Sequence, residues 1–334
     1  MNFERKSSVQ RVVGKAHEAY KEGVLKGRGN QFRNQIFEGL EGKEKKKTPE
    51  QIQIIQDVDV ATNELLAKYA LPAFSIPPEN VHIIHDDQWH DKESAGFFRP
   101  IAQAIAVREQ PTNTVFMATV FHEMIHFKSY GAEQADVEGG DLRRYRVGLS
   151  LQSRTKEKGH FFTAINEAVT EELTKKHARS LLRHPVLRGE IEETRRTIRE
   201  YPNAISYRTG ERLLDEDTFC ATSHVTKEWN NAVWRYFGTS VGLKNVDTKI
   251  MVQKFSYPKE RQALKILVSK IFQENKDGFT NEDEVFEIFA KAMMTGNMLP
   301  LGKVIDKTFG VGVFRKIGEY NEDVEGLKTY IETL

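Results

Sequence analysis

One stretch of the chain, Val115–Phe127, constrains the fold more than any other. Almost every side chain in it is apolar. The polar exceptions are Thr119, His122, Glu123 and His126, which are spaced at i, i+3, i+4 and i+7. This spacing places them on one stripe of an α-helix. Because a buried polar stripe is costly unless its groups are paired or bound, the stretch predicts a mostly buried helix with a partner for its polar side.

The polar stripe has the spacing of a metal site. His122 and His126 are one turn apart and Glu123 lies beside them, which is the His-Glu-x-x-His arrangement. In that arrangement two imidazoles bind zinc and the carboxylate acts on a water molecule. The alternative is a pair of buried histidines that are hydrogen-bonded inside a core. The metal site is favoured, because ordinary cores avoid helices that carry His and Glu on one stripe.

A zinc site needs a third protein ligand, and the segment Thr163–Leu173 offers one. Glu167 and Glu171 are four residues apart, on one face of a predicted helix. Two carboxylates on one face repel each other. Beside Zn²⁺, however, one can bind the metal while the other accepts the N–H of a ligand histidine. The alternative is a solvated acidic face, which the neighbouring Glu172 would extend.

Together the two segments resemble the gluzincins, the thermolysin-like metallopeptidases, over about Val81–Lys175. That family has His-Glu-x-x-His followed by Asn-Glu-x-x-x-Asp/Glu on a second helix. The matching residues are His122, Glu123, His126, Asn166, Glu167 and Glu171. The resemblance implies that His122, His126 and Glu167 bind zinc. It also implies that Glu123 is the general base and that Glu171 is the hydrogen-bond partner of a ligand histidine.

Peptide hydrolysis also needs a hydrogen-bond donor to the oxyanion of the tetrahedral intermediate, and no sequence motif identifies this donor clearly. Tyr207 is our first choice, since a phenol can donate a hydrogen bond to a tetrahedral intermediate. His224 is the second choice, and both can equally be packing residues. His160 precedes the second motif helix closely and could line the cleft.

The segment Ile101–Val107 suits a β-strand directly before the motif helix. In gluzincins a strand in this place borders the cleft, and an extended substrate pairs with its edge. The resemblance therefore implies that the substrate backbone binds at Ala104, Ile105 and Ala106. The alternative is a central strand without an available edge.

The remaining pattern predicts an α+β fold, in which a small mixed β-sheet precedes and interrupts two zinc-bearing helices. The expected elements are a helix from the cap residue Thr48 to about Tyr69, strands at Val81–Ile84 and Leu142–Leu151, a hairpin through Thr155–Gly159, and helices at Thr163–Leu182 and Arg188–Glu200. We expect a zincin-like catalytic domain at residues 48–200 and a helical C-terminal domain at residues 201–334.

Residues 1–47 differ in composition from the rest. They carry twelve Lys and Arg against six Glu, a net charge of +6, and several glycines. The segment is therefore predicted to be a basic, flexible extension. Its few aromatic side chains argue against nucleic acid as a partner.

The whole chain of 334 residues has a net charge of only +1, which gives no general attraction to nucleic acid or membranes. No apolar run approaches the length of a membrane span, and the first residues lack the apolar core of a signal peptide. The single cysteine, Cys220, excludes an internal disulfide framework and fits a reducing, cytoplasmic compartment.

These observations predict a zinc-dependent metallopeptidase, with Zn²⁺ as cofactor and a peptide or protein as substrate. Two alternatives stay open. One is a non-catalytic protein in which zinc is a structural staple of a binding site. The other is a protease dedicated to one protein target. The sequence leaves the oligomeric state open.

Overall fold

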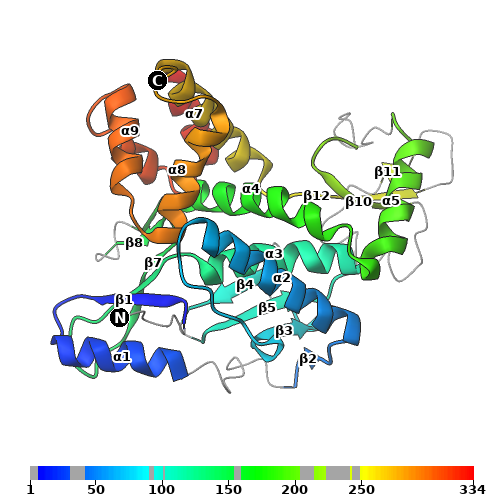
Figure 1. The fold of residues 1–334 in the computed structure, drawn as a ribbon, viewed down its shortest axis with the longest axis horizontal. Helices are drawn as coiled ribbons and strands as arrows, with labels where there is room; N and C mark the ends of the chain where they lie inside the picture. Colours follow the sequence, from blue (N-terminus) through cyan, green and yellow to red (C-terminus); the bar gives the residue numbers. More distant parts are fainter. Residues whose placement is uncertain are drawn as a thin grey trace.

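The computed structural model describes residues 7–30, 42–89, 94–100, 102–153, 159–203, 214–222, 241–242 and 249–334. These residues form an α+β protein with small mixed sheets and a helical C-terminal part, as predicted (Figure 1). Its strands are β1 Val9–Val13, β2 Glu44–Lys45, β3 Val81–Ile84, β4 Gly96–Arg99, β5 Ala104–Arg108, β6 Gly131–Gln134, β7 Arg143–Val147, β8 Ser150–Gln152, β9 His160–Phe161, β10 Thr218–Thr222, β11 Val241–Gly242 and β12 Lys249–Lys254. Its α-helices are α1 Glu18–Asn30, α2 Pro49–Lys68, α3 Asn113–Lys128, α4 Thr163–Leu181, α5 Arg188–Glu200, α7 Pro258–Glu274, α8 Glu282–Thr295, α9 Leu299–Phe309, α10 Val313–Glu319 and α11 Val324–Thr333.

The four-stranded sheet lies beneath α2 and α3 in Figure 1 and has the order β2-β3-β5-β4. β3 and β5 are parallel, and β4 pairs with β5 antiparallel. The strand predicted over Ile101–Val107 is β5, and it has a neighbour on each side. Its four residues from Ala104 to Val107 are fully buried, so β5 is the centre of this sheet and β4 lies at its edge.

The helix predicted from Thr48 onward is α2. Its first turn is fixed by a reciprocal capping box. The Thr48 hydroxyl accepts the Gln51 N–H at 3.2 Å, and the Gln51 side-chain oxygen accepts the Thr48 N–H at 3.0 Å. One face of α2 then packs on α3 through Ile55, Val58 and Leu66, all of them fully buried.

The five-stranded sheet has the order β1-β6-β7-β8-β9. The single strand predicted over Leu142–Leu151 is wrong, because the chain reverses between β7 and β8. Gly148 lies in the turn with a φ of +58°, which an L side chain rarely adopts. A Cβ there would lie 2.4 Å from the side-chain oxygen of Asn166. The predicted return of the chain to Phe161 is confirmed by the pairing of Leu151 with Phe161.

The N-terminal segment is not an extension over residues 7–30. β1 pairs in parallel with β6, and α1 packs beside it. Arg28 and Glu133 form a buried ion pair with 3.1 Å between Nε and Oε2, and they are only 5% and 1% exposed. The positive charge and the glycines predicted a flexible extension, but the charge of Arg28 compensates a buried carboxylate on β6.

Replacing Arg28 with Met is expected to lower the free energy of unfolding by about 3–5 kcal/mol, because Glu133 would stay buried without its charged partner. Chemical denaturation of the purified variant measures this loss. Lys26→Met removes the same charge from an exposed position of α1 and should leave the denaturation midpoint where it is. Equal midpoints for both variants would contradict a structural role of the N-terminal segment.

The C-terminal part shares its core with the preceding residues. One hydrophobic cluster contains Ile55 of α2, Phe121 of α3, Leu267 of α7 and Phe289 of α8. The boundary predicted at residue 200 therefore does not divide the main core. The C-terminal part is also not purely helical, since β10 and β12 pair antiparallel before α7 begins.

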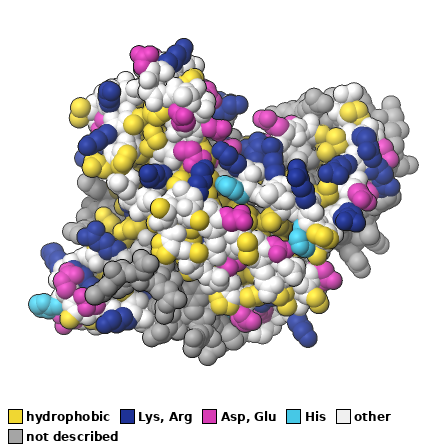
Figure 2. All heavy atoms as spheres, viewed as in Figure 1, with side chains coloured by type: hydrophobic (Ala, Val, Ile, Leu, Met, Phe, Trp, Pro, Cys, Tyr) yellow, Lys and Arg dark blue, Asp and Glu magenta, His cyan; other side chains and the backbone are white. Residues whose placement is uncertain are grey.

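The outer face of α5 is solvated, as its alternating Arg and Glu predict. Ile191, Thr194 and Thr197 face inward, whereas Arg195 and Arg199 are exposed. In Figure 2, Lys and Arg side chains gather over α5 and the end of α4. Among the described residues, no helix combines the length and the apolar character that crossing a membrane requires.

Candidate metal centre

The predicted motif helix is α3, and its position is fixed at its first turn. The Thr112 hydroxyl accepts the Val115 N–H at 3.1 Å. Glu190 of α5 accepts the backbone N–H groups of Asn113 and Thr114 at 2.8 and 2.7 Å. A carboxylate at this end also suits the helix dipole. Almost the whole helix is buried, so the direction of its polar stripe is set by packing on every side.

The polar stripe of α3 faces α4, which carries the two predicted carboxylates. Oε2 of Glu167 lies 3.3 Å from Nε2 of His122 and 3.1 Å from Nε2 of His126. The two Nε2 atoms are 3.1 Å apart. Among the described residues, these three side chains are the one group of His, Cys, Asp or Glu with a geometry for holding a metal ion.

Glu171 determines which ring nitrogen of His122 can bind a metal ion. Its Oε2 lies 2.7 Å from Nδ1 of His122. Because a carboxylate only accepts, Nδ1 carries a proton, which leaves Nε2 as the ring nitrogen that can bind a metal ion. Nε2 faces the Nε2 atom of His126 and the Glu167 oxygen. Protons on the imidazoles or a bound metal ion can offset the repulsion between these three converging atoms.

The donor separations fit zinc. A tetrahedral Zn²⁺ with ligands at about 2.0–2.1 Å holds its donors roughly 3.3 Å apart. The three separations of 3.1–3.3 Å match this value. Two imidazoles and one carboxylate are also a donor set of catalytic zinc sites, which leave one position for water. The residues present therefore fit the predicted ion.

The electrostatics agree with a cation site. Burial raises the pKa of Glu167, but His126 and His122 outweigh it and hold the pKa well below its ordinary value. Burial lowers the pKa of His122, but hydrogen bonds to Glu167 and Glu171 reverse the direction. Glu167 is thus ionised at neutral pH and available as a ligand.

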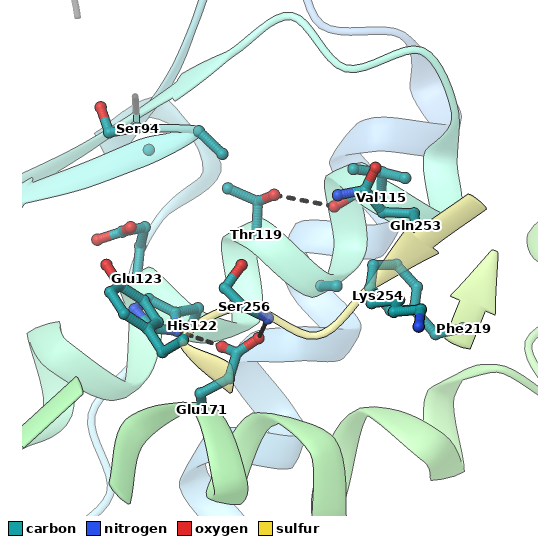
Figure 3. A pocket seen from close by; sticks show the side chains of 14 residues that line it. Ser94, Val115, Thr119, His122, Glu123, Glu171, Phe219, Gln253, Lys254 and Ser256 are labelled. Carbon is teal, nitrogen blue, oxygen red and sulfur yellow. Dashed lines mark hydrogen bonds and ion pairs between the residues drawn. The ribbon is translucent and has the colours of Figure 1, made fainter. Parts of the chain in front are cut away.

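Glu171 also connects the two halves of the site. Its second oxygen accepts the backbone N–H of Ser256, which follows β12. Figure 3 places the Glu171 carboxylate between His122 and Ser256. Since Glu171 is buried, both contacts are sheltered from water. The predicted contact with a histidine is present, and the contact with Ser256 is additional.

Glu123 differs from the other acidic groups of the centre. It is 7% exposed, and no hydrogen-bond partner contacts its side chain among the described residues. Burial raises its pKa above the ordinary value. Its carboxyl group reaches into a cavity next to His122 (Figure 3). A carboxylate with an unused lone pair and a raised pKa is suited to accept a proton from water.

Tyr257 is the site residue that the sequence analysis missed. Its ring stacks on His122 with 5.6 Å between centroids and 16° between planes. Its φ of +56° is uncommon for a residue other than glycine, and such strain often occurs at functional sites. The negative charge of Glu167 and burial raise the pKa of Tyr257, so its hydroxyl keeps its proton. A Tyr before Pro at a helix start is an ordinary pattern, so the sequence carried no signal for this role.

The predicted oxyanion donors Tyr207 and His224 lie outside the described residues. Their roles stay predictions.

Two cavities flank the centre. One of about 270 Å³ is lined by Thr119, Phe219 and Gln253. The other, of about 330 Å³, is lined by Phe98 and Val147. Both are also lined by the residues they share: Gly96, His122, Glu123 and Tyr257. The metal centre is therefore reached from two sides.

The predicted substrate-binding residues Ala104, Ile105 and Ala106 are wrong. They belong to the central strand β5, whose backbone pairs with β3 and β4, and they have no exposed surface. The strand that borders the cavities is β4. A Cβ on Gly96 would lie 3.1 Å from the Glu123 side chain, so a glycine lets this edge approach the centre closely.

The second cavity is also lined by polar side chains from other elements. His160 lines it, as predicted, together with Arg144, Ser150 and Glu322. These residues come from the five-stranded sheet and from the segment before α11.

Comparisons with family models, curated proteins and solved structures gave no match.

Proposed function

We propose that this protein is a zinc-dependent metallopeptidase with a zincin-like core, in which His122, His126 and Glu167 hold the metal. The observation that carries the proposal is the convergence of three possible ligand atoms beside a buried glutamate that has no hydrogen-bond partner among the described residues. A structural zinc site has no use for such a glutamate at the mouth of two cavities. This argues for catalysis over a zinc staple.

The chain's own groups divide the chemistry between them. When bound, zinc would polarise the scissile carbonyl and lower the pKa of a water molecule. Glu123 accepts the proton of the attacking water and passes it to the leaving amine nitrogen. Tyr257 keeps its phenolic proton and donates a hydrogen bond to the carbonyl oxygen as negative charge develops there. Glu171 holds the His122 ring in the tautomer that ligation requires.

The substrate would lie along β4. An extended peptide can add to a sheet edge through backbone hydrogen bonds. β4 is at the edge of its sheet. Gly96 lines both cavities, and Phe97 and Phe98 line the second one. The peptide would then run between the two cavities, with its scissile bond beside Glu123.

Metal content and cleavage of a peptide library test the proposal together. We expect close to one zinc per chain by mass spectrometry of protein purified without chelator or His tag. We also expect defined cleavage products from a mixed peptide library. Absence of metal even after dialysis against zinc would refute the metal site. Full zinc occupancy without cleavage of any peptide would refute a general peptidase.

Tyr257→Phe is expected to lower kcat by about 10²–10³-fold, since it removes one donor to the developing oxyanion. KM and zinc content should change little, because the ring still stacks on His122. Steady-state kinetics on a library-derived peptide measure the effect. Tyr330→Phe on α11 is the control and should keep the wild-type rate. An unchanged kcat in Tyr257→Phe would assign the oxyanion to another donor.

A further inference from the structure

Among the residues that the structure describes, Arg144 has no hydrogen-bond or ion-pair partner that accounts for its place in the second cavity. It lies on β7 and is exposed, and no carboxylate of the described residues lies within 4 Å of its guanidinium. Arg146 on the same strand is different. It is buried and donates to the carbonyl oxygens of Gly148, Gly296 and Ala292. Arg146 therefore holds the fold together, whereas no described residue occupies the donors of Arg144.

The surroundings of Arg144 connect it with the metal centre. It lines the same cavity as His122, His126 and Glu167, and Glu167 is near enough to attract its positive charge. A bound cation would neutralise Glu167, and the guanidinium would then be without a compensating anion on that side. His160 and Ser150 line the same cavity and can add further hydrogen bonds. The exposed Glu322 also lines it and would disfavour an anion near its own position.

We propose that the second cavity is a subsite for a carboxylate of the substrate, bound by Arg144. This inference rests on the proposed function, since it places the carboxylate next to the scissile bond. The guanidinium is suited to this ligand, because its planar donors match a carboxylate in two parallel hydrogen bonds. The carboxylate is either an Asp or Glu side chain or the C-terminus of a peptide. Both sources share this chemistry.

A binding experiment tests the subsite without turnover. The probes are two hydroxamates that chelate zinc, glutaric acid monohydroxamate and the corresponding terminal amide. Calorimetry with the zinc-loaded protein should give at least about tenfold tighter binding of the carboxylate probe, as charge-assisted hydrogen bonds predict. In Arg144→Gln the ratio of the two affinities should fall to about one. Arg144→Lys should keep part of the preference, since it keeps the charge and loses the paired geometry.

Arg143 provides the matched control. It is also exposed on β7, is the adjacent residue and does not line the cavity. Arg143→Gln should keep the wild-type preference. An equal loss of preference in both variants would show a general effect of surface charge and overturn the subsite. Equal affinity of the wild type for both probes would overturn it too, with the proposed function intact. If the zinc-loaded protein binds neither probe, the cavity admits no ligand and the proposed function fails with it.

Two peptide series identify the source of the carboxylate. One series compares Glu with Gln at each internal position of peptides with an amidated C-terminus. The other compares free and amidated C-termini. A preference of kcat/KM in the first series, lost in Arg144→Gln, assigns an acidic side chain. The same result in the second series assigns the C-terminus. A peptidase that prefers the acid in neither series has no carboxylate subsite.

Discussion

Glu123→Gln is expected to keep its zinc and to lose peptide cleavage by at least about 10²–10⁴-fold, the contribution of a positioned general base. The amide has the size of the carboxylate but cannot accept a proton from water. Glu123 is not one of the three converging donors, so the metal should remain. Its side chain has no hydrogen bond to a described residue, so the substitution should also leave the fold intact.

Single-turnover cleavage and metal analysis on the same preparation measure the loss of cleavage and the retention of zinc separately. Glu192→Gln makes the same chemical change at an exposed position of α5 and should cleave like the wild type. The mechanism would be falsified if Glu123→Gln cleaved at the wild-type rate with zinc bound. Loss of zinc in the variant would instead indicate that Glu123 is itself a ligand of the metal.

The site residues that could be predicted are those whose spacing along the sequence matches the 3.6-residue repeat of one α-helix. His122, Glu123 and His126 lie within two turns of one helix, so a 3.6-residue repeat is enough to place them on one face. The same argument predicted that Glu167 and Glu171 share a face of α4. Their contacts with α3 then followed from the chemistry of the groups, and the distances bear this out.

The parts that could not be predicted depend on contacts between distant segments. Tyr257 reaches the centre because Glu171 accepts the N–H of the residue before it and because the backbone turns into the left-handed region there. Neither condition leaves a mark in the local sequence. The order of strands in a sheet also depends on contacts between distant segments. Gly96–Arg99 is a short strand, and its position outside β5 decides which backbone borders the cavities.

Charge was misleading for a related reason. The basic composition of residues 1–47 predicted a flexible extension, yet Arg28 is buried against Glu133. Composition reports how many charges a segment carries and not which of them find a partner in the fold. The α+β class and the helical C-terminal part depend on many residues at once and were predicted correctly.

Glu167→Ala should release the metal, and Glu171→Gln should weaken its binding by a smaller and defined amount. Glu167 contributes one of the three donor atoms, and two histidines alone hold zinc poorly. Glu171 touches the metal only through His122, and the loss of such a partner typically costs about 10–100-fold in metal affinity. Competition with a chromophoric chelator measures both dissociation constants. We expect the order wild type, Glu171→Gln, Glu167→Ala, from tightest to weakest.

The order of the two zinc affinities distinguishes the carboxylate that binds the metal from the carboxylate that only holds His122. Glu172→Gln is the control on the same helix, because Glu172 pairs with Arg261 and is not among the three converging donors. It should bind zinc like the wild type. Wild-type zinc affinity in a folded Glu167→Ala protein would point to another third ligand. A stronger loss in Glu171→Gln than in Glu167→Ala would exchange the roles of the two carboxylates, and the assignment of Nε2 as the ligand atom of His122 would then be wrong.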